Sequence, residues 1–169
     1  AELLGLIDEE RIRYIGSMVL GLNDALVELT GAIAGFTFAL RDPRLVAMAG
    51  LITGIAGSLS MASSEYLSIK SEGGDRSPAK ASIYTGLAYV LTVILLISPF
   101  LILDEPLICL GLAILSSILV IMGFTFYTSI AKGLPFKRRF LEMAFISLGV
   151  AGLSFVVGLL VRAFLNIEI

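Results

Sequence analysis

The 169-residue chain is 57% hydrophobic and 15% charged, and its mean hydropathy of +0.98 lies outside the range of soluble domains. The formal charge of -2 offers no basic field for nucleic acid, and the absence of histidine excludes an imidazole base, a histidine metal ligand and a Ser-His-Asp triad. We expect no enzyme activity, catalytic residue or bound cofactor. The lone cysteine, Cys109, cannot form an intrachain disulfide and is expected to face lipid or to pack.

The first thirteen residues are acidic and amphipathic, without the basic start and cleavage site of a secretory signal. We expect residues 1–13 to form a cytoplasmic or interfacial segment. The chain begins at Ala1 rather than at methionine, which indicates either processing or excision from a longer protein.

The remainder of the chain predicts a five-helix transmembrane domain over residues 14–169. A bilayer core about 30 Å thick needs roughly 20 apolar residues in a helix. Four uncharged runs of 19 to 26 residues meet this length, and charged or Pro/Gly-containing segments separate them. The expected spans are 14–40, 44–69, 80–103, 106–131 and 140–165.

The first span is unusual because it carries two acids, Asp24 and Glu28, between apolar pieces too short to cross alone. They lie one helical turn apart, so they share a face. An acid at the centre of a membrane helix costs roughly 2.5–3.5 kcal/mol, so these two should face a cavity, a cation or a partner. The alternative is a fixed packing contact to a basic or backbone group.

Nine of the twelve basic residues fall on one side of the predicted membrane, which places the N-terminus in the cytoplasm and the C-terminus outside. Asp24 lies about 18 Å along the helix from Ile12, near the middle of the bilayer. In the second span Glu65 lies about 7–8 Å from Lys70, with Met61 one turn deeper. Asp24 and Met61 could therefore meet at similar depth.

A carboxylate beside a thioether suits a soft divalent cation better than Mg²⁺ or Ca²⁺, and ferrous iron fits this mixture. Carboxylates in a membrane can also hold protons when no metal is bound, so metal-for-proton exchange is chemically possible. Met61 alone is more often a packing residue. Nearer the cytoplasm, Glu65 and Glu72 are each either solvated or ligands at the mouth.

Other polar residues could serve the same path. Glu9, Glu10 and Glu142 could ring the cytoplasmic entrance, or they could be solvated helix ends. Ser60, Ser63, Ser64 and Ser68 give the second span the polar stretch that a cavity-lining helix needs.

Small residues predict where helices approach closely. Gly31 and Gly35 form a G-x-x-x-G step in the first span, and Gly50 and Gly54 form another in the second. The first step is a candidate oligomer face. The alternative is that glycine is simply common in membrane helices.

Two stretches resemble the vacuolar iron transporter family. Residues 21–35, GLNDALVELTGAIAG, are similar to its first-helix pattern, and residues 60–74, SMASSEYLSIKSEGG, to its second-helix signature. The resemblance implies a dimer that moves Fe²⁺, and in some members Mn²⁺, out of the cytosol in exchange for protons. It also implies that Asp24, Met61 and Glu65 line the path.

The chain departs from the family pattern in two respects. Ala25 stands where glycine is usual, with Glu28 added a turn later, and only residues 71–79 join the second and third spans, where some members carry a glutamate-rich domain. Some relatives instead carry a ferritin-like domain before the first span.

The leading hypothesis is a dimeric Fe²⁺ or Mn²⁺ transporter with Asp24, Glu28, Met61, Glu65 and Glu72 along its path. The host would be a prokaryotic cell membrane, with a vacuolar-type membrane as the alternative. Two other functions stay open: a membrane anchor for a soluble iron-storage or ferritin-like partner, and a proton-coupled carrier of another small solute.

Overall fold

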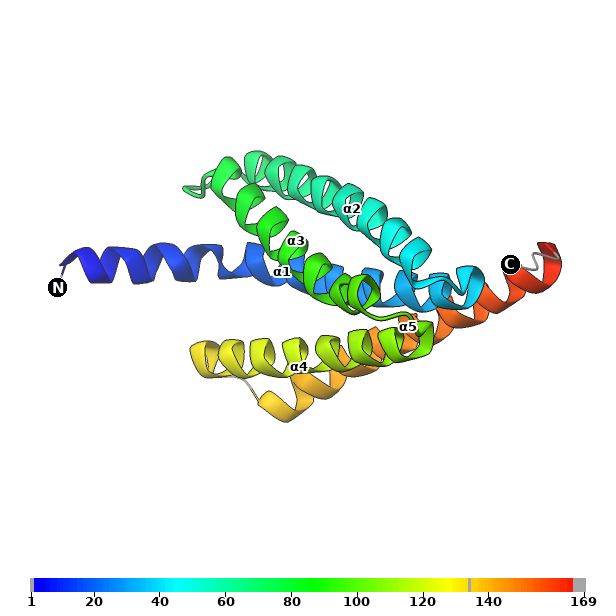
Figure 1. The fold of residues 1–169 in the computed structure, drawn as a ribbon. Helices are drawn as coiled ribbons and strands as arrows, with labels where there is room; N and C mark the ends of the chain where they lie inside the picture. The colour runs from blue at the N-terminus through cyan, green and yellow to red at the C-terminus, as the bar shows by residue number, and fades with distance from the viewer. Residues whose placement is uncertain (1, 134, 166–169) are drawn as a thin grey trace.

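The computed structural model describes residues 2–133 and 135–165, and these fold into five helices (Figure 1). They are α1 (Glu2–Leu40), α2 (Pro43–Glu72), α3 (Pro78–Ile102), α4 (Pro106–Lys132) and α5 (Phe136–Leu165). Each is long and apolar enough to cross a membrane. The prediction of an all-α chain with five spans is confirmed.

Capping groups mark several of the helix ends. α2 begins at Pro43 behind the Asp42 side chain, which accepts a hydrogen bond of 2.8 Å from the backbone N–H of Arg44. Gly73 caps the C-terminus of α2 and Gly133 caps that of α4, each in the left-handed conformation that closes helix C-termini.

Three helix boundaries differ from the expected ones by more than two residues. α1 begins at Glu2 rather than at residue 14, α2 continues to Glu72 rather than to residue 69, and α5 begins at Phe136 rather than at residue 140. The sequence prediction stopped at charged residues, whereas a helix stops where its backbone is capped. The additional turns therefore carry charged side chains beyond the apolar part of each span.

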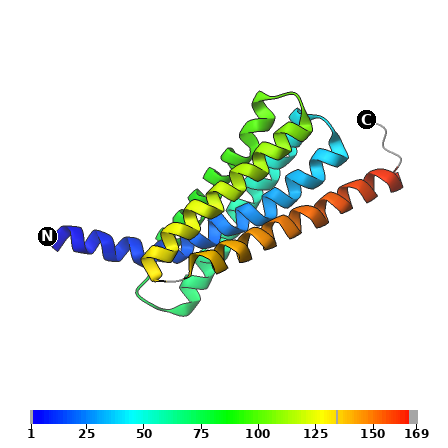
Figure 2. The same cartoon turned by 90° about the horizontal axis from the view of Figure 1, so that it is seen from below.

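Helix α1 is the central element of the bundle (Figure 1). It contacts all four other helices, with α2 and α3 on one side and α4 and α5 on the other. It runs without interruption through Asp24 and Glu28, so the prediction of one helix with internal acids is confirmed. The first turns of α1 and the last turns of α5 extend from opposite ends of the bundle (Figure 2).

Both glycine steps serve contacts within the chain. A Cβ on Gly31 would lie 2.8 Å from a Val150 methyl group of α5, and one on Gly158 would lie 2.5 Å from the Gly35 carbonyl oxygen. Helix α5 therefore packs on the G-x-x-x-G face of α1, so the close contact that this spacing predicts is made within the chain. In α2, Gly54 makes room for Val93 of α3.

The exposed surface is apolar, as expected of a bundle that lipid surrounds. Large apolar side chains point outward along α3 and α5, and Phe145 and Phe164 are 82% and 83% exposed. Cys109, in contrast, is fully buried, and its thiol donates to the Pro99 carbonyl oxygen at 3.4 Å. It is a packing residue.

Candidate functional site

Asp24 and Glu28 both face an open groove between α1 and α2. The groove has a volume of about 530 Å³. Helix α2 supplies the other wall, and its lining residues are Ile52, Thr53, Ala56, Gly57, Ser60 and Met61. The two acidic side chains of the first span therefore line the same groove.

Met61 enters this groove at the same depth as Asp24. Asp24 is ten residues from Tyr14 and Met61 is eleven from the end of α2 at Glu72, which correspond to about 15 and 16 Å along each helix. Tyr14 lies at that same end of the bundle, because its hydroxyl accepts a hydrogen bond from the backbone N–H of Ser77 at 2.8 Å. The structure therefore brings a carboxylate pair and a thioether together about halfway along the spans.

Glu28 has a partner on a third helix. The Tyr89 hydroxyl of α3 donates to Glu28 Oε2 at 3.0 Å, and the tyrosine is fully buried. Gly57 of α2 makes this reach possible, since a Cβ there would collide with the tyrosine hydroxyl. The contact holds the carboxylate of an otherwise exposed side chain in one place.

Sequence reasoning missed Tyr89. A usable signal was present: tyrosine is enriched at membrane interfaces, yet Tyr89 lies eleven residues into α3, close to its middle. A buried tyrosine hydroxyl needs a hydrogen-bond partner. Its position thus indicated a polar group at mid-depth on a neighbouring helix.

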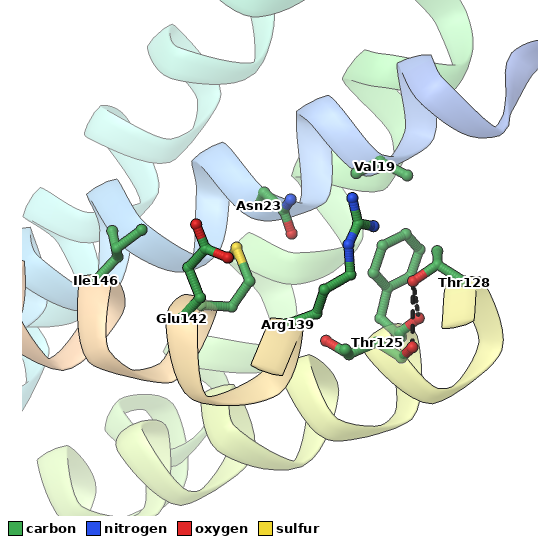
Figure 3. A pocket seen from close by; sticks show the side chains of 9 residues that line it. Val19, Asn23, Thr125, Thr128, Arg139, Glu142 and Ile146 are labelled. Carbon is green, nitrogen blue, oxygen red and sulfur yellow. Dashed lines mark hydrogen bonds between the residues drawn. The ribbon is translucent and has the colours of Figure 1, made fainter. Parts of the chain in front are cut away.

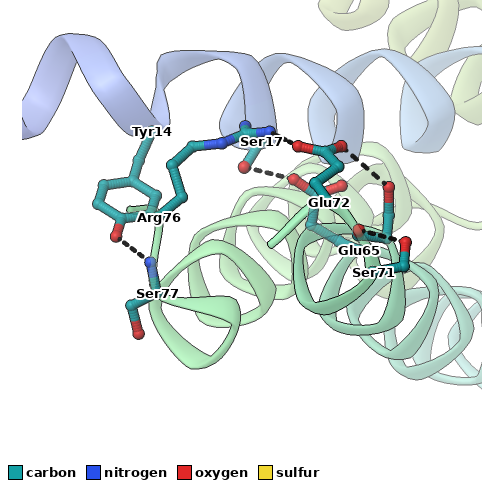
Figure 4. Close-up of polar contacts among 8 residues, drawn as sticks. Tyr14, Ser17, Glu65, Ser71, Glu72, Arg76 and Ser77 are labelled. Carbon is teal, nitrogen blue, oxygen red and sulfur yellow. Dashed lines mark hydrogen bonds and ion pairs between the residues drawn. The ribbon is translucent and has the colours of Figure 1, made fainter. Parts of the chain in front are cut away.

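Glu65 lies apart from the groove, in the contact between α1 and α2 (Figure 4). It is 7% exposed and accepts a hydrogen bond of 2.5 Å from the Ser17 hydroxyl. The backbone carbonyl oxygen of Ser17 in turn accepts a hydrogen bond of 2.9 Å from the Thr85 hydroxyl of α3. A buried carboxylate therefore joins α1 and α2, one turn nearer the helix end than Met61.

Glu72 lies at the end of α2 and is exposed (Figure 4). It forms an ion pair of 2.5 Å with Arg76 and a hydrogen bond of 3.5 Å with the Ser68 hydroxyl. Exposed pairs of this kind contribute little to stability, about 0–1 kcal/mol, so the carboxylate can exchange partners readily.

The remaining acids and serines have varied positions. The side chains of Glu9 and Glu10 lie outside the described residues, and Glu142 lines a different cavity. Of the four serines, Ser60 lines the groove, and Ser63 donates back to the Leu59 carbonyl oxygen at 2.7 Å.

The groove offers two carboxylates, one thioether and the hydroxyls of Thr53 and Ser60. Among the side chains that the structure describes, those of residues 14–130, 133 and 135–164, no three acidic or cysteine side chains converge as a metal cluster. A cation held here would therefore keep other ligands from water or from another chain. Glu28 is also exposed on the open side of the groove, where bare contact with lipid would be costly.

These features define a multi-pass, all-α membrane protein with a polar groove at mid-span. Residues 15–74 match the VIT family. Over 103 residues, the chain is 29% identical to "Vacuolar iron transporter homolog 4" of Arabidopsis thaliana, a match that covers 50% of this chain and 52% of that protein. The chain is therefore similar to this family over its first two spans, and residues 15–74 contain both walls of the groove.

Proposed function

We propose that the protein moves a divalent metal ion, Fe²⁺ first and Mn²⁺ second, out of the cytosol in exchange for protons. One observation carries the proposal: Asp24, Glu28 and Met61 line a single groove about halfway along the spans. Intramembrane acids are functional by default, and the family and the relative's name point to the same class of substrate.

The donor set explains the choice of metal. Two carboxylates supply charge, while the Met61 thioether favours softer transition ions over Mg²⁺ and Ca²⁺. When the metal leaves, the same carboxylates can take up protons. The empty site then returns to its starting state without an uncompensated charge in the membrane. Glu72 would act at the cytoplasmic mouth and Glu65 between mouth and groove.

A second copy of the chain would close the open side of the groove. The exposed Glu28 needs a covering surface, and two copies could each add ligands to the metal. Because α5 already occupies the Gly31 and Gly35 face, the dimer would use the groove side of α1 and α2.

The transport proposal is tested with the purified chain in proteoliposomes that contain a metal-sensitive or pH-sensitive dye. Vesicles with an acidic lumen should take up Fe²⁺ and Mn²⁺ faster than Zn²⁺, and luminal pH should rise as metal enters. An ionophore that collapses the pH gradient should slow uptake.

Other results of this transport assay would favour other functions. Metal uptake that is indifferent to the pH gradient would contradict proton exchange. Proton flux that ignores divalent metal would favour a carrier of another solute. No flux at all would favour a membrane anchor for a soluble iron-handling partner.

Tyr89→Phe should weaken the apparent metal affinity roughly tenfold, because a hydrogen bond to a charged group contributes about 1.5–3 kcal/mol and Glu28 would lose its fixed position. The measurement is the KM for Fe²⁺ uptake. Tyr84→Phe is the matched control, since Tyr84 lies on the same helix but packs against Tyr14 instead. An unchanged KM in Tyr89→Phe would show that this tyrosine does not position Glu28.

A further inference from the structure

A second polar cavity lies between α1, α4 and α5, away from the α1/α2 groove (Figure 3). Its volume of about 220 Å³ is far larger than the ~10–15 Å³ that one water molecule requires. The lining residues are Val19, Asn23, Phe124, Thr125, Thr128, Arg139, Glu142, Met143 and Ile146. The function proposed above does not use this cavity as a binding site.

The cavity carries one positive and one negative side chain. Arg139 and Glu142 lie three residues apart on α5, so they project from neighbouring positions on one face. Figure 3 shows both side chains directed at the cavity, beside the Asn23 amide. They form no ion pair with each other, and the ion pair found among described residues joins Arg76 and Glu72 instead.

Neutral polar groups complete the lining. Thr125 and Thr128 are buried on α4. The Thr128 hydroxyl donates to the carbonyl oxygens of Phe124 and Thr125 at 3.1 and 3.2 Å, so its own oxygen is left to accept a hydrogen bond. Asn23 can both donate and accept.

The Arg139 end of the cavity lies near the level of lipid headgroups, and the cavity extends inward as far as Asn23, the neighbour of Asp24 on α1. Arg139 is three residues into α5, about 4.5 Å from its start, and the headgroup region extends roughly 5–7 Å beyond the hydrocarbon on each side. This is the end of the bundle that the basic residues place in the cytoplasm. Apolar walls from Val19, Phe124 and Ile146 suit the start of an acyl chain.

The two charges select the class of ligand. A lone cation would be repelled by Arg139 and a lone anion by Glu142, whereas a zwitterion satisfies both. We propose that the cavity binds the headgroup of a phospholipid that carries a primary ammonium, such as phosphatidylethanolamine. Arg139 would hold the phosphate, and Glu142, with the Thr128 oxygen and the Asn23 carbonyl, would accept from the ammonium.

The cavity also adjoins the acid-bearing face of α1. Val19, Asn23 and Met143 line both this cavity and a neighbouring groove that contains Asp24. A headgroup bound here would therefore lie beside the helix face that carries the transport acids, although its binding does not depend on metal transport.

The proposal is tested with the purified full chain in lipid-free detergent. Short-chain phosphatidylethanolamine, phosphatidylcholine and phosphatidylglycerol are added separately, and bound lipid is counted by native mass spectrometry alongside thermal unfolding. The ethanolamine lipid should bind roughly tenfold more tightly than the other two, because choline has no N–H to donate and glycerol has no positive charge.

Two variants test which group of the lipid each charged side chain binds. Arg139→Gln should lose most of the ethanolamine binding, and Glu142→Gln should bind the glycerol lipid at least as well as the ethanolamine lipid. Lys137→Gln is the control, since it removes a positive charge from the same exposed turn but lies outside the cavity lining. It should keep the wild-type preference.

Several outcomes would overturn the proposal. Equal binding of all three lipids by the wild-type chain would show no headgroup site, as would an unchanged preference in Arg139→Gln and Glu142→Gln. Full competition by free phosphoethanolamine would identify a soluble ligand instead of a lipid. If Arg139→Gln failed to fold, the reversed preference of Glu142→Gln would still decide, because misfolding cannot create a gain of glycerol-lipid binding.

Discussion

Asp24→Asn should lower Fe²⁺ uptake into proteoliposomes at least about 100-fold. The change keeps the side-chain volume but removes a negative charge that faces the groove at mid-span. At an effective dielectric constant near 20, a charge pair 4 Å apart contributes about 4 kcal/mol, and a divalent ion doubles this attraction. The lost attraction between the metal ion and the carboxylate is therefore the main cost of the substitution, and the cost of burying an amide is smaller.

The result can be separated from misfolding. Removing an acid from the membrane lowers the cost of insertion, so Asp24→Asn should fold and melt at least as well as the wild-type chain. Asp75→Asn, which changes an exposed acid between α2 and α3, should transport normally. Wild-type uptake by Asp24→Asn would show that this groove is not the metal route.

Met61→Leu addresses selectivity in the same assay. It conserves apolar volume but removes the sulfur, so uptake of Fe²⁺ should fall more than uptake of Mn²⁺, which depends less on a soft ligand. An unchanged ratio of Fe²⁺ uptake to Mn²⁺ uptake would show that Met61 is a packing residue and not a ligand.

Gly158→Leu should destabilise the protein by about 3 kcal/mol, at the upper end of the cost of overpacking. Even the Cβ would lie 2.5 Å from the Gly35 carbonyl oxygen and 3.1 Å from the Gly35 Cα. Both atoms belong to the backbone of α1, so they cannot rotate away and α5 would have to move. The measurement is the midpoint of denaturant-induced or thermal unfolding in detergent.

Gly149→Leu provides the matched control on the same helix. A Cβ on Gly149 meets nothing within 4 Å, so this variant should be unchanged, or more stable by up to about 1 kcal/mol because leucine favours helix over glycine. Equal losses in the two variants would mean that α5 does not pack on α1 at Gly158.

The sequence was sufficient to predict which residues of the α1/α2 groove share a helix face and a depth. Periodicity placed Asp24 and Glu28 on one face, and the rise per residue placed Met61 at matching depth. The structure brings all three to one groove. Their role as metal ligands stays a prediction until transport is measured.

Other features depended on which helices are neighbours. The Tyr89 hydroxyl lies 61 residues from Glu28 along the chain, and Ser17 lies 48 residues from Glu65. No local pattern encodes these pairs. The same is true of Gly31 and Gly35, whose spacing predicts a close contact but does not say whether the partner is α5 or a second chain.

By itself, the sequence determined the number of spans, the acids within the first and the depth of each polar residue. These follow from local hydropathy and helix geometry, which need no knowledge of the rest of the fold. Only the tertiary structure decided that Tyr89 holds Glu28, that Ser17 holds Glu65, and that α5 covers the glycines of α1. In lipid, every apolar helix face is equally well solvated, so burial cannot select neighbours, and the choice falls to close packing and hydrogen bonds between helices.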